Sequence, residues 1–118
     1  MTRVAERVTS GEDLRIAVAE FLDDLKFASS RDEIRRRILE EPPCVDAHVD
    51  AYLAALAEDV AMRNEVRAPA WALAPHRFLD HFWWPSKVIA LRARTMVESP
   101  PAFRRRGIFI GATTLHRV

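Results

Sequence analysis

Apolar side chains recur along this chain at the spacing of α-helices. In two segments, 14–25 and 49–60, they follow one another three or four residues apart, which places them on one face of a helix. The first set is Leu14, Val18, Phe21, Leu22 and Leu25, and the second is Val49, Tyr52, Leu53, Leu56, Ala57 and Val60. The second helix is expected to run from Asp46 to about Arg63. Because it is rich in alanine, neighbouring helices can approach it closely, and we predict that it is the central helix.

Residues that cap helices mark where the other helices begin. Ser10-Gly11-Glu12-Asp13 precedes the first apolar set, and Ser30 with Glu33 forms the capping box of a helix that Pro42-Pro43 closes. Ser86 is expected to cap a helix over residues 87–97. Its inward-facing stripe is predicted to consist of Ile89, Ala93, Met96 and Val97, widened by Val88 and Leu91. A short helix is expected after Ser99-Pro100-Pro101, ended by Gly107.

The stretch 64–85 has no such periodicity and is interrupted by prolines. It leaves room for a short turn at Pro75–Asp80, and residues 108–110 form a brief β-prone piece. Leu115 and Val118 are expected to add a last turn. The sequence therefore predicts an all-α fold, a small single-domain helical bundle over residues 1–118. It has four main helices, short helical turns and an irregular Pro/Trp-rich connection, with residues 1–9 as a frayed N-terminus.

The composition is typical of a globular protein. The 118 residues are 49% hydrophobic and 30% charged. No apolar run approaches the roughly 20 residues that a membrane-spanning helix needs, so no membrane association is expected. The charged N-terminus is not followed by the apolar stretch of a secretory signal, and the single cysteine, Cys44, cannot form an intrachain disulfide. We therefore expect a cytoplasmic protein.

The small net charge of +1 conceals an asymmetry between the two halves of the chain. Residues 1–60 hold 8 Lys and Arg against 14 Asp and Glu, whereas residues 61–118 hold 10 against 3. The halves thus carry −6 and +7. Such polarity is compatible with acidic helices lying against basic ones inside the molecule, which is the favoured interpretation. It is also compatible with an anionic partner for the second half.

The residues that carry enzyme or metal chemistry do not form a recognisable site. His76, Asp80 and His81 stand at i, i+4 and i+5, and the i/i+4 pair could lie on one helix face like the first two ligands of a zinc site, but a third ligand is lacking. Three glycines are too few and too scattered for a phosphate-binding loop. Ser86 and Ser99 are explained as helix caps. We therefore expect no catalytic residue, no metal, no cofactor and no enzymatic activity.

The sequence HFWWPS at 81–86 places three large rings side by side. Consecutive side chains diverge by roughly 100° in a helix and 180° in a strand, so Phe82, Trp83 and Trp84 cannot all enter one core. An exposed ring is a candidate anchor for a partner, and arginine pairs readily with carboxylate or phosphate. The predicted partner-binding residues are Phe82, Trp83, Trp84, Arg77, Arg104, Arg105 and Arg106. A protein partner is favoured, and nucleic acid and a homodimer remain open alternatives.

Three pieces of the second half carry a family resemblance: PAW at 69–71, RFLDHFWWP at 77–85 and ESPPAFRRRGIFI at 98–110. Over residues 50–118 the chain resembles short actinobacterial antitoxin-like proteins that are paired with nucleotidyltransferase-like toxins. The resemblance implies a toxin as partner and supplies no catalytic residues. Longer members carry a helix-turn-helix domain. Residues 1–40 show no such domain, so direct operator binding is not expected.

Overall fold

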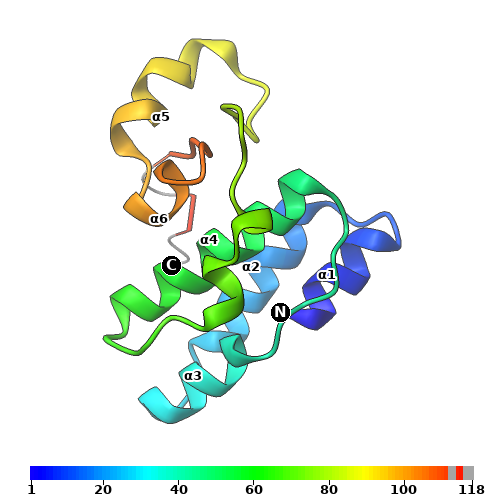
Figure 1. Ribbon diagram of the computed structural model, residues 1–118, viewed down its shortest axis with the longest axis vertical. Coiled ribbons are helices and arrows are strands. Elements are labelled where there is room, and N and C mark those ends of the chain that lie inside the picture. The colour runs from blue at the N-terminus through cyan, green and yellow to red at the C-terminus, as the bar shows by residue number, and fades with distance from the viewer. Residues whose placement is uncertain (112–113, 116–118) are drawn as a thin grey trace.

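Helices make up the regular structure of the described residues, 1–111 and 114–115, of this computed structural model (Figure 1). The α-helices are α1 (Thr2–Thr9), α2 (Leu14–Leu25), α3 (Arg31–Leu39), α4 (Ala47–Arg63), α5 (Arg92–Glu98) and α6 (Pro101–Arg104). Three 3₁₀ turns join them: η1 (Ala70–Leu73), η2 (Pro75–Arg77) and η3 (Ile89–Leu91). The all-α fold is confirmed, because this part of the chain contains no strand, but it has six α-helices rather than four main ones. None of these helices is long and apolar enough to cross a membrane.

Helix α4 is the central element of the fold, as its sequence predicts. It begins after Asp46, whose Oδ1 accepts a hydrogen bond from the Val49 amide at 2.9 Å, and it ends at Arg63. Every residue from Val49 to Ala61 is buried. Helices α3 and α6 and the turns η1 and η2 all pack against it. A helix that is packed on several sides needs small side chains where its neighbours approach, and the five alanines between positions 51 and 61 provide them.

Helix α1 occupies residues 2–9, where a frayed segment is expected from the sequence. Helix α1 packs against α2 and buries Val4 and Ala5. Arg7 reinforces this packing because its guanidinium forms ion pairs with Glu12, at 2.6 Å, and with Glu20. A short apolar face together with these ion pairs is enough to hold a helix of this length on its neighbour.

Residues 87–97 differ from the single inward-facing helix that the sequence predicts. They form η3 followed by α5, and the side chains of Ile89, Met96 and Val97 are exposed. Only Thr95 of α5 is buried, and the main contacts of α5 are with η3. Helical periodicity shows which residues share one face of a helix, but not whether that face meets the core or the solvent. In Figure 1 this segment lies at the end of the molecule farthest from α3.

Short connections hold η3 and α5 to the rest of the molecule. The Ser99 hydroxyl, directly after α5, accepts a hydrogen bond from the Ile110 amide at 2.8 Å and lies 2.6 Å from the Thr95 carbonyl oxygen. Helix α6 then returns the chain to α4. We call residues 78–111 the C-terminal lobe. Leu115 is buried in a turn, as expected, and Val118 lies outside the described residues.

The predicted capping box opens α3, with one difference in detail. The Ser30 hydroxyl accepts from the Glu33 amide at 3.2 Å, but the Glu33 carboxylate accepts from the Ser29 amide at 2.9 Å rather than from the Ser30 amide. The bond from Ser29, together with Arg37, lowers the pKa of Glu33 from 4.5 to about 2. The carboxylate is therefore stabilised in its ionised form in the folded protein.

This lowered pKa predicts how stability responds to acid. Because ionised Glu33 favours the folded state, its contribution is complete above pH 4.5 and is lost as the pH falls towards about 2. Glu33→Gln keeps a side chain that can cap but cannot ionise. We expect urea denaturation of this variant to show a weaker loss of stability over that range than the wild type. Asp32→Asn is the control, and an equal effect of both variants would contradict the role of the Glu33 carboxylate.

Candidate partner-binding surface

The backbone around Trp83 is extended, and this conformation determines the directions of the three consecutive rings Phe82, Trp83 and Trp84. The Trp83 amide donates to the Gly107 carbonyl at 2.8 Å, and the Phe109 amide donates to the Trp83 carbonyl at 3.0 Å. This isolated parallel bridge joins the connection to the segment after α6. Side chains alternate along extended backbone, so Trp83 points to one side while Phe82 and Trp84 point to the other.

Trp83 is attached to the central helix. Its indole stacks on the His48 ring, with 4.4 Å between centroids and 5° between planes, and meets Tyr52 edge-on at 6.3 Å. Its neighbours lie against Phe109, whose centroid is 5.3 Å from that of Phe82 and 5.2 Å from that of Trp84. Trp84 is half-buried there, whereas Phe82 is 65% exposed. Phe82 is therefore the ring that remains exposed outside the core.

Gly107 allows the two segments to approach this closely. Its φ is +80°, and a Cβ at this position would lie 2.8 Å from the His81 carbonyl oxygen. Any other residue would clash with backbone and adopt a strained conformation. The position of the aromatic segment therefore depends on the glycine that ends the α6 region.

Arg77 is fully buried and binds the acidic half of the chain. Its guanidinium donates to the carbonyl oxygens of Pro42 at 2.9 Å and Asp50 at 3.3 Å. One amino group also lies 3.4 Å from the Glu41 carboxylate, and the Trp71 ring stands 5.0 Å away. These contacts hold the guanidinium inside the molecule, although its Nε has no hydrogen-bond partner, so the predicted partner-binding residue Arg77 lies in the interior of this structure.

Arg106 is the second fully buried arginine among the predicted partner-binding residues. It donates to Glu58 Oε1 and to the Ala102 carbonyl, both at 2.8 Å, and to the Ala72 carbonyl. Its guanidinium lies 4.3 Å from the centroid of the Phe78 ring. Burial lowers the pKa of Arg106, and the hydrogen bond to Glu58 opposes this shift. Glu58 is thus the internal partner of Arg105 and Arg106, a role that its position on the buried α4 helix could have indicated.

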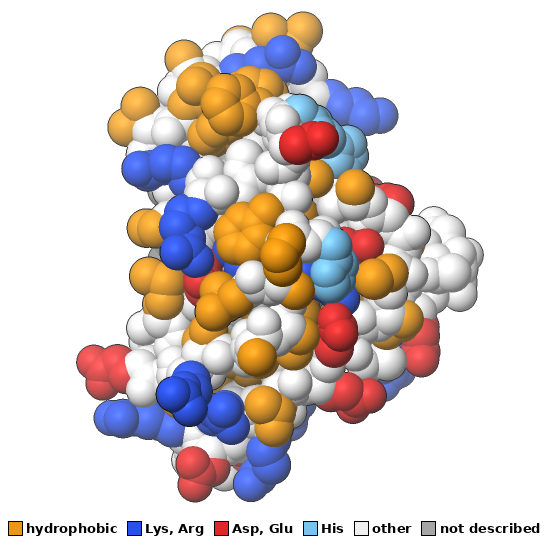
Figure 2. All heavy atoms as spheres, in the orientation of Figure 1, with side chains coloured by type: hydrophobic (Ala, Val, Ile, Leu, Met, Phe, Trp, Pro, Cys, Tyr) orange, Lys and Arg blue, Asp and Glu red, His pale blue; other side chains and the backbone are white. Residues whose placement is uncertain are grey.

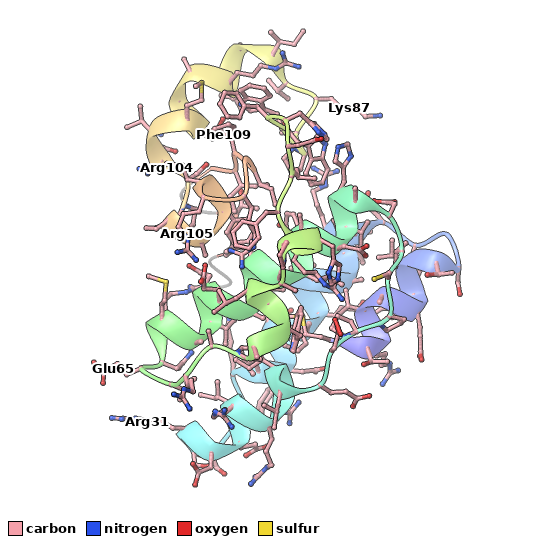
Figure 3. All side chains as sticks on the ribbon, viewed as in Figure 1. Arg31, Glu65, Lys87, Arg104, Arg105 and Phe109 are labelled. Atoms are coloured by element: carbon pink, nitrogen blue, oxygen red, sulfur yellow. The ribbon has the colours of Figure 1, made fainter. Side chains whose placement is uncertain are left out.

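Arg104 and Arg105 reach the surface, where Figure 3 shows both on the same side of the molecule. Arg105 also pairs with Glu58, but about half of its side chain is exposed. Arg104 donates to the carbonyl oxygens of Val97 at 3.1 Å and Ser99 at 2.8 Å, at the C-terminal end of α5. Arginines of the basic half thus pair with acids of the first half, whereas Arg104 has no carboxylate partner among the described residues; the paired ones are Arg63, Arg77, Arg105 and Arg106.

The most exposed apolar part of the C-terminal lobe is one that the sequence did not suggest. Five large apolar side chains of ten consecutive residues are exposed, and we call them the η3–α5 face: Val88, Ile89, Leu91, Met96 and Val97. Figure 2 shows hydrophobic and basic side chains interleaved at this end of the molecule. The exposed basic residues there are Lys87, Arg92, Arg94 and Arg104. Phe82 belongs to the same lobe and contacts Trp84, on which Arg92 of α5 stacks.

His48 and His81 form a contact between α4 and the aromatic connection. Their Nε2 atoms are 2.8 Å apart and their ring centroids 5.1 Å, so the two nitrogens point at each other. The other nitrogen of His81 lies 2.7 Å from the Asp80 carboxylate. The contact is a hydrogen bond that needs one imidazole nitrogen without a proton. No group of three metal-binding side chains occurs within residues 1–111 and 114–115.

Comparison with known proteins gives no family for this chain. No protein-family model, no curated protein and no solved structure matches it. Function must therefore be inferred from the geometry of the C-terminal lobe.

The buried arginine predicts an unequal effect of two adjacent substitutions. Arg106→Ala removes a guanidinium from the interior and is expected to lower the free energy of unfolding by about 3–5 kcal/mol. Arg105→Ala, at a half-exposed ion pair, is expected to cost less than about 1 kcal/mol. Urea denaturation followed by circular dichroism measures both. Similar losses in the two variants would contradict the distinction between these arginines.

The stacking of Trp83 on His48 predicts a change in fluorescence on substitution. The indole lies flat on the imidazole ring, so His48→Gln is expected to alter the intensity and the wavelength of tryptophan emission. His76→Gln, which changes an exposed histidine outside the contact, is the control. An unchanged emission spectrum in His48→Gln would contradict the assignment.

Proposed function

We propose that this protein is a non-enzymatic interaction module, an antitoxin that neutralises a nucleotidyltransferase-like toxin by direct binding. The observation that carries the proposal is the η3–α5 face together with Phe82. Ile89 is 72% exposed, Val97 78% and Phe82 65%, all within sixteen residues of the chain. Exposed apolar clusters of this kind on small proteins commonly mark interaction sites.

The distribution of charge supports a protein partner. Aromatic and apolar residues with arginine are typical of interface anchors. Arg92, Arg94 and Arg104 are exposed around the apolar residues. A nucleotidyltransferase-like toxin offers a complementary surface, because its active site would use carboxylates to hold magnesium. Covering those carboxylates would block the toxin, and the resemblance of residues 50–118 to antitoxin-like proteins supplies the partner class.

Nucleic acid binding is the alternative that the exposed basic residues favour. The two functions differ in salt dependence, because each phosphate contact lowers affinity by nearly one power of the salt concentration. Binding anchored by apolar side chains depends on salt mainly through the charged residues at its edge. The exposed Ile89 and Val97 have no role on a phosphate backbone, and this favours the protein partner.

The proposal predicts suppression of toxicity by co-expression. The protein encoded beside this chain is expected to be nucleotidyltransferase-like, to arrest growth when expressed alone, and to form a stable complex with this chain in size-exclusion chromatography. Growth should return when both are expressed. A gel-shift with DNA and RNA at low salt is the parallel measurement.

Three outcomes would overturn the antitoxin assignment. A neighbouring gene that encodes an unrelated metabolic enzyme would do so, and so would undiminished toxicity in the presence of this chain. Nucleic acid binding that weakens steeply with salt, together with no binding to the neighbouring protein, would support the nucleic acid function instead.

A further inference from the structure

Two arginine side chains are held at opposite ends of α5. Arg92, at its start, lies with its guanidinium carbon 4.9 Å from the centroid of the Trp84 ring. Arg104 lies at the other end, where it donates to the carbonyl oxygens of Val97 and Ser99. A helix of seven residues is about 10 Å long, which sets the approximate separation of the two groups along α5.

Both guanidinium groups lack a carboxylate partner within the part of the chain that the structure describes. The acid of α5, Glu98, pairs with Arg94 at 2.7 Å. Stacking on Trp84 and bonding to carbonyl oxygens restrict Arg92 and Arg104, so less conformational entropy is lost when they bind a carboxylate. The two ends of α5 are therefore prepared to bind acidic groups.

Exposed apolar side chains precede Arg92 in η3 and lie close to the end of α5 near Arg104. Ile89 and Val97 are the most exposed members of the η3–α5 face, and β-branched side chains have few rotamers to lose on binding. The ten residues from Val88 to Val97 span roughly 16 Å, from about 2.0 Å per residue in η3 and 1.5 Å in α5. A contact area of about 800 Å² per partner accommodates a patch of this length.

We infer that the η3–α5 face docks into an apolar groove of a protein partner that carries carboxylates about 10 Å apart, one for Arg92 and one for Arg104. The inference names the contact surface of the proposed function, and for the toxin as partner it rests on that function. In this inference the apolar contacts with the partner are made by Ile89 and Val97 rather than by the tryptophans. Trp84 instead holds the Arg92 guanidinium in position by stacking. A second copy is a poorer occupant, because a two-fold interface would bring together two copies of a face whose acid, Glu98, already pairs with Arg94.

The test uses two probes so that the inference and the proposed function can fail separately. The first is the purified protein encoded beside this chain. The second is a labelled helical peptide with a leucine face and two glutamates seven residues apart, which lie about 10 Å from each other. A peptide with lysines in place of the glutamates is its control. Fluorescence anisotropy measures binding of both peptides to the full chain.

The variants change only exposed side chains. Ile89→Ser with Val97→Ser removes apolar surface, and Arg92→Glu reverses a charge. Phe27→Ser, at a phenylalanine that is 83% exposed beyond α2, and Arg36→Glu, on α3, are the matched controls. Circular dichroism checks that each variant folds. We expect the face variants to weaken binding of both probes by at least about tenfold, and the controls by less than about twofold.

Each pattern of results decides one of the two proposals. Tight binding of the neighbouring protein that the face variants leave unchanged would overturn the inference and keep the function. Face-dependent binding of the acidic peptide, with no binding of the neighbouring protein, would keep the inference and overturn the function. Equal binding of acidic and basic peptides would overturn the carboxylate requirement. Binding of neither probe would overturn both, as would self-association through Val97.

Discussion

The contact between Glu58 and Arg106 is the interaction on which the arrangement of the C-terminal half depends. Glu58 belongs to the central helix and Arg106 to the segment after α6, and the side chain of Arg106 is fully buried. The same guanidinium also binds carbonyl oxygens of Ala102 and Ala72. Removing one partner of a buried charge pair leaves the other charge without compensation, so the two segments must stay together.

This internal neutralisation divides the basic residues into two groups. Arg77 and Arg106 compensate acidic residues and carbonyl oxygens of the fold, whereas Arg92 and Arg104 meet an aromatic ring and backbone oxygens at the surface. The overall asymmetry of charge therefore overstates how much positive charge faces a partner. Around the η3–α5 face, the exposed basic residues are Lys87, Arg92, Arg94 and Arg104.

Much of the fold follows from local sequence. Ser30 and Asp46 cap α3 and α4 at the predicted positions, because a side-chain oxygen next to a free amide needs no distant residue. The divergence of three consecutive rings also predicts that one of them is left outside, and Phe82 is that ring. These properties depend on bond geometry and on hydrogen bonds between residues close in sequence, so they can be predicted from the sequence alone.

The rest depends on contacts between distant segments. Arg77 is buried because Pro42 and Asp50 bring carbonyl oxygens to it, and no local pattern separates it from the exposed Arg104. The apolar stripe of residues 87–97 has helical spacing, but spacing does not tell whether a face meets a core or a partner. Prolines 85, 100 and 101 bracket this segment and keep it short, and it packs mainly on itself.

Chemical modification of arginine in the folded protein tests this division most directly. A dicarbonyl reagent attacks accessible guanidinium groups, and peptide mapping by mass spectrometry locates each adduct. The structure predicts that Arg92 and Arg104 react in the native protein, while Arg77 and Arg106 react only after unfolding in urea. Modification of Arg106 at the rate of Arg92 under native conditions would contradict the account, because Arg106 would then be accessible and the lobe would not be held to α4 through its contact with Glu58.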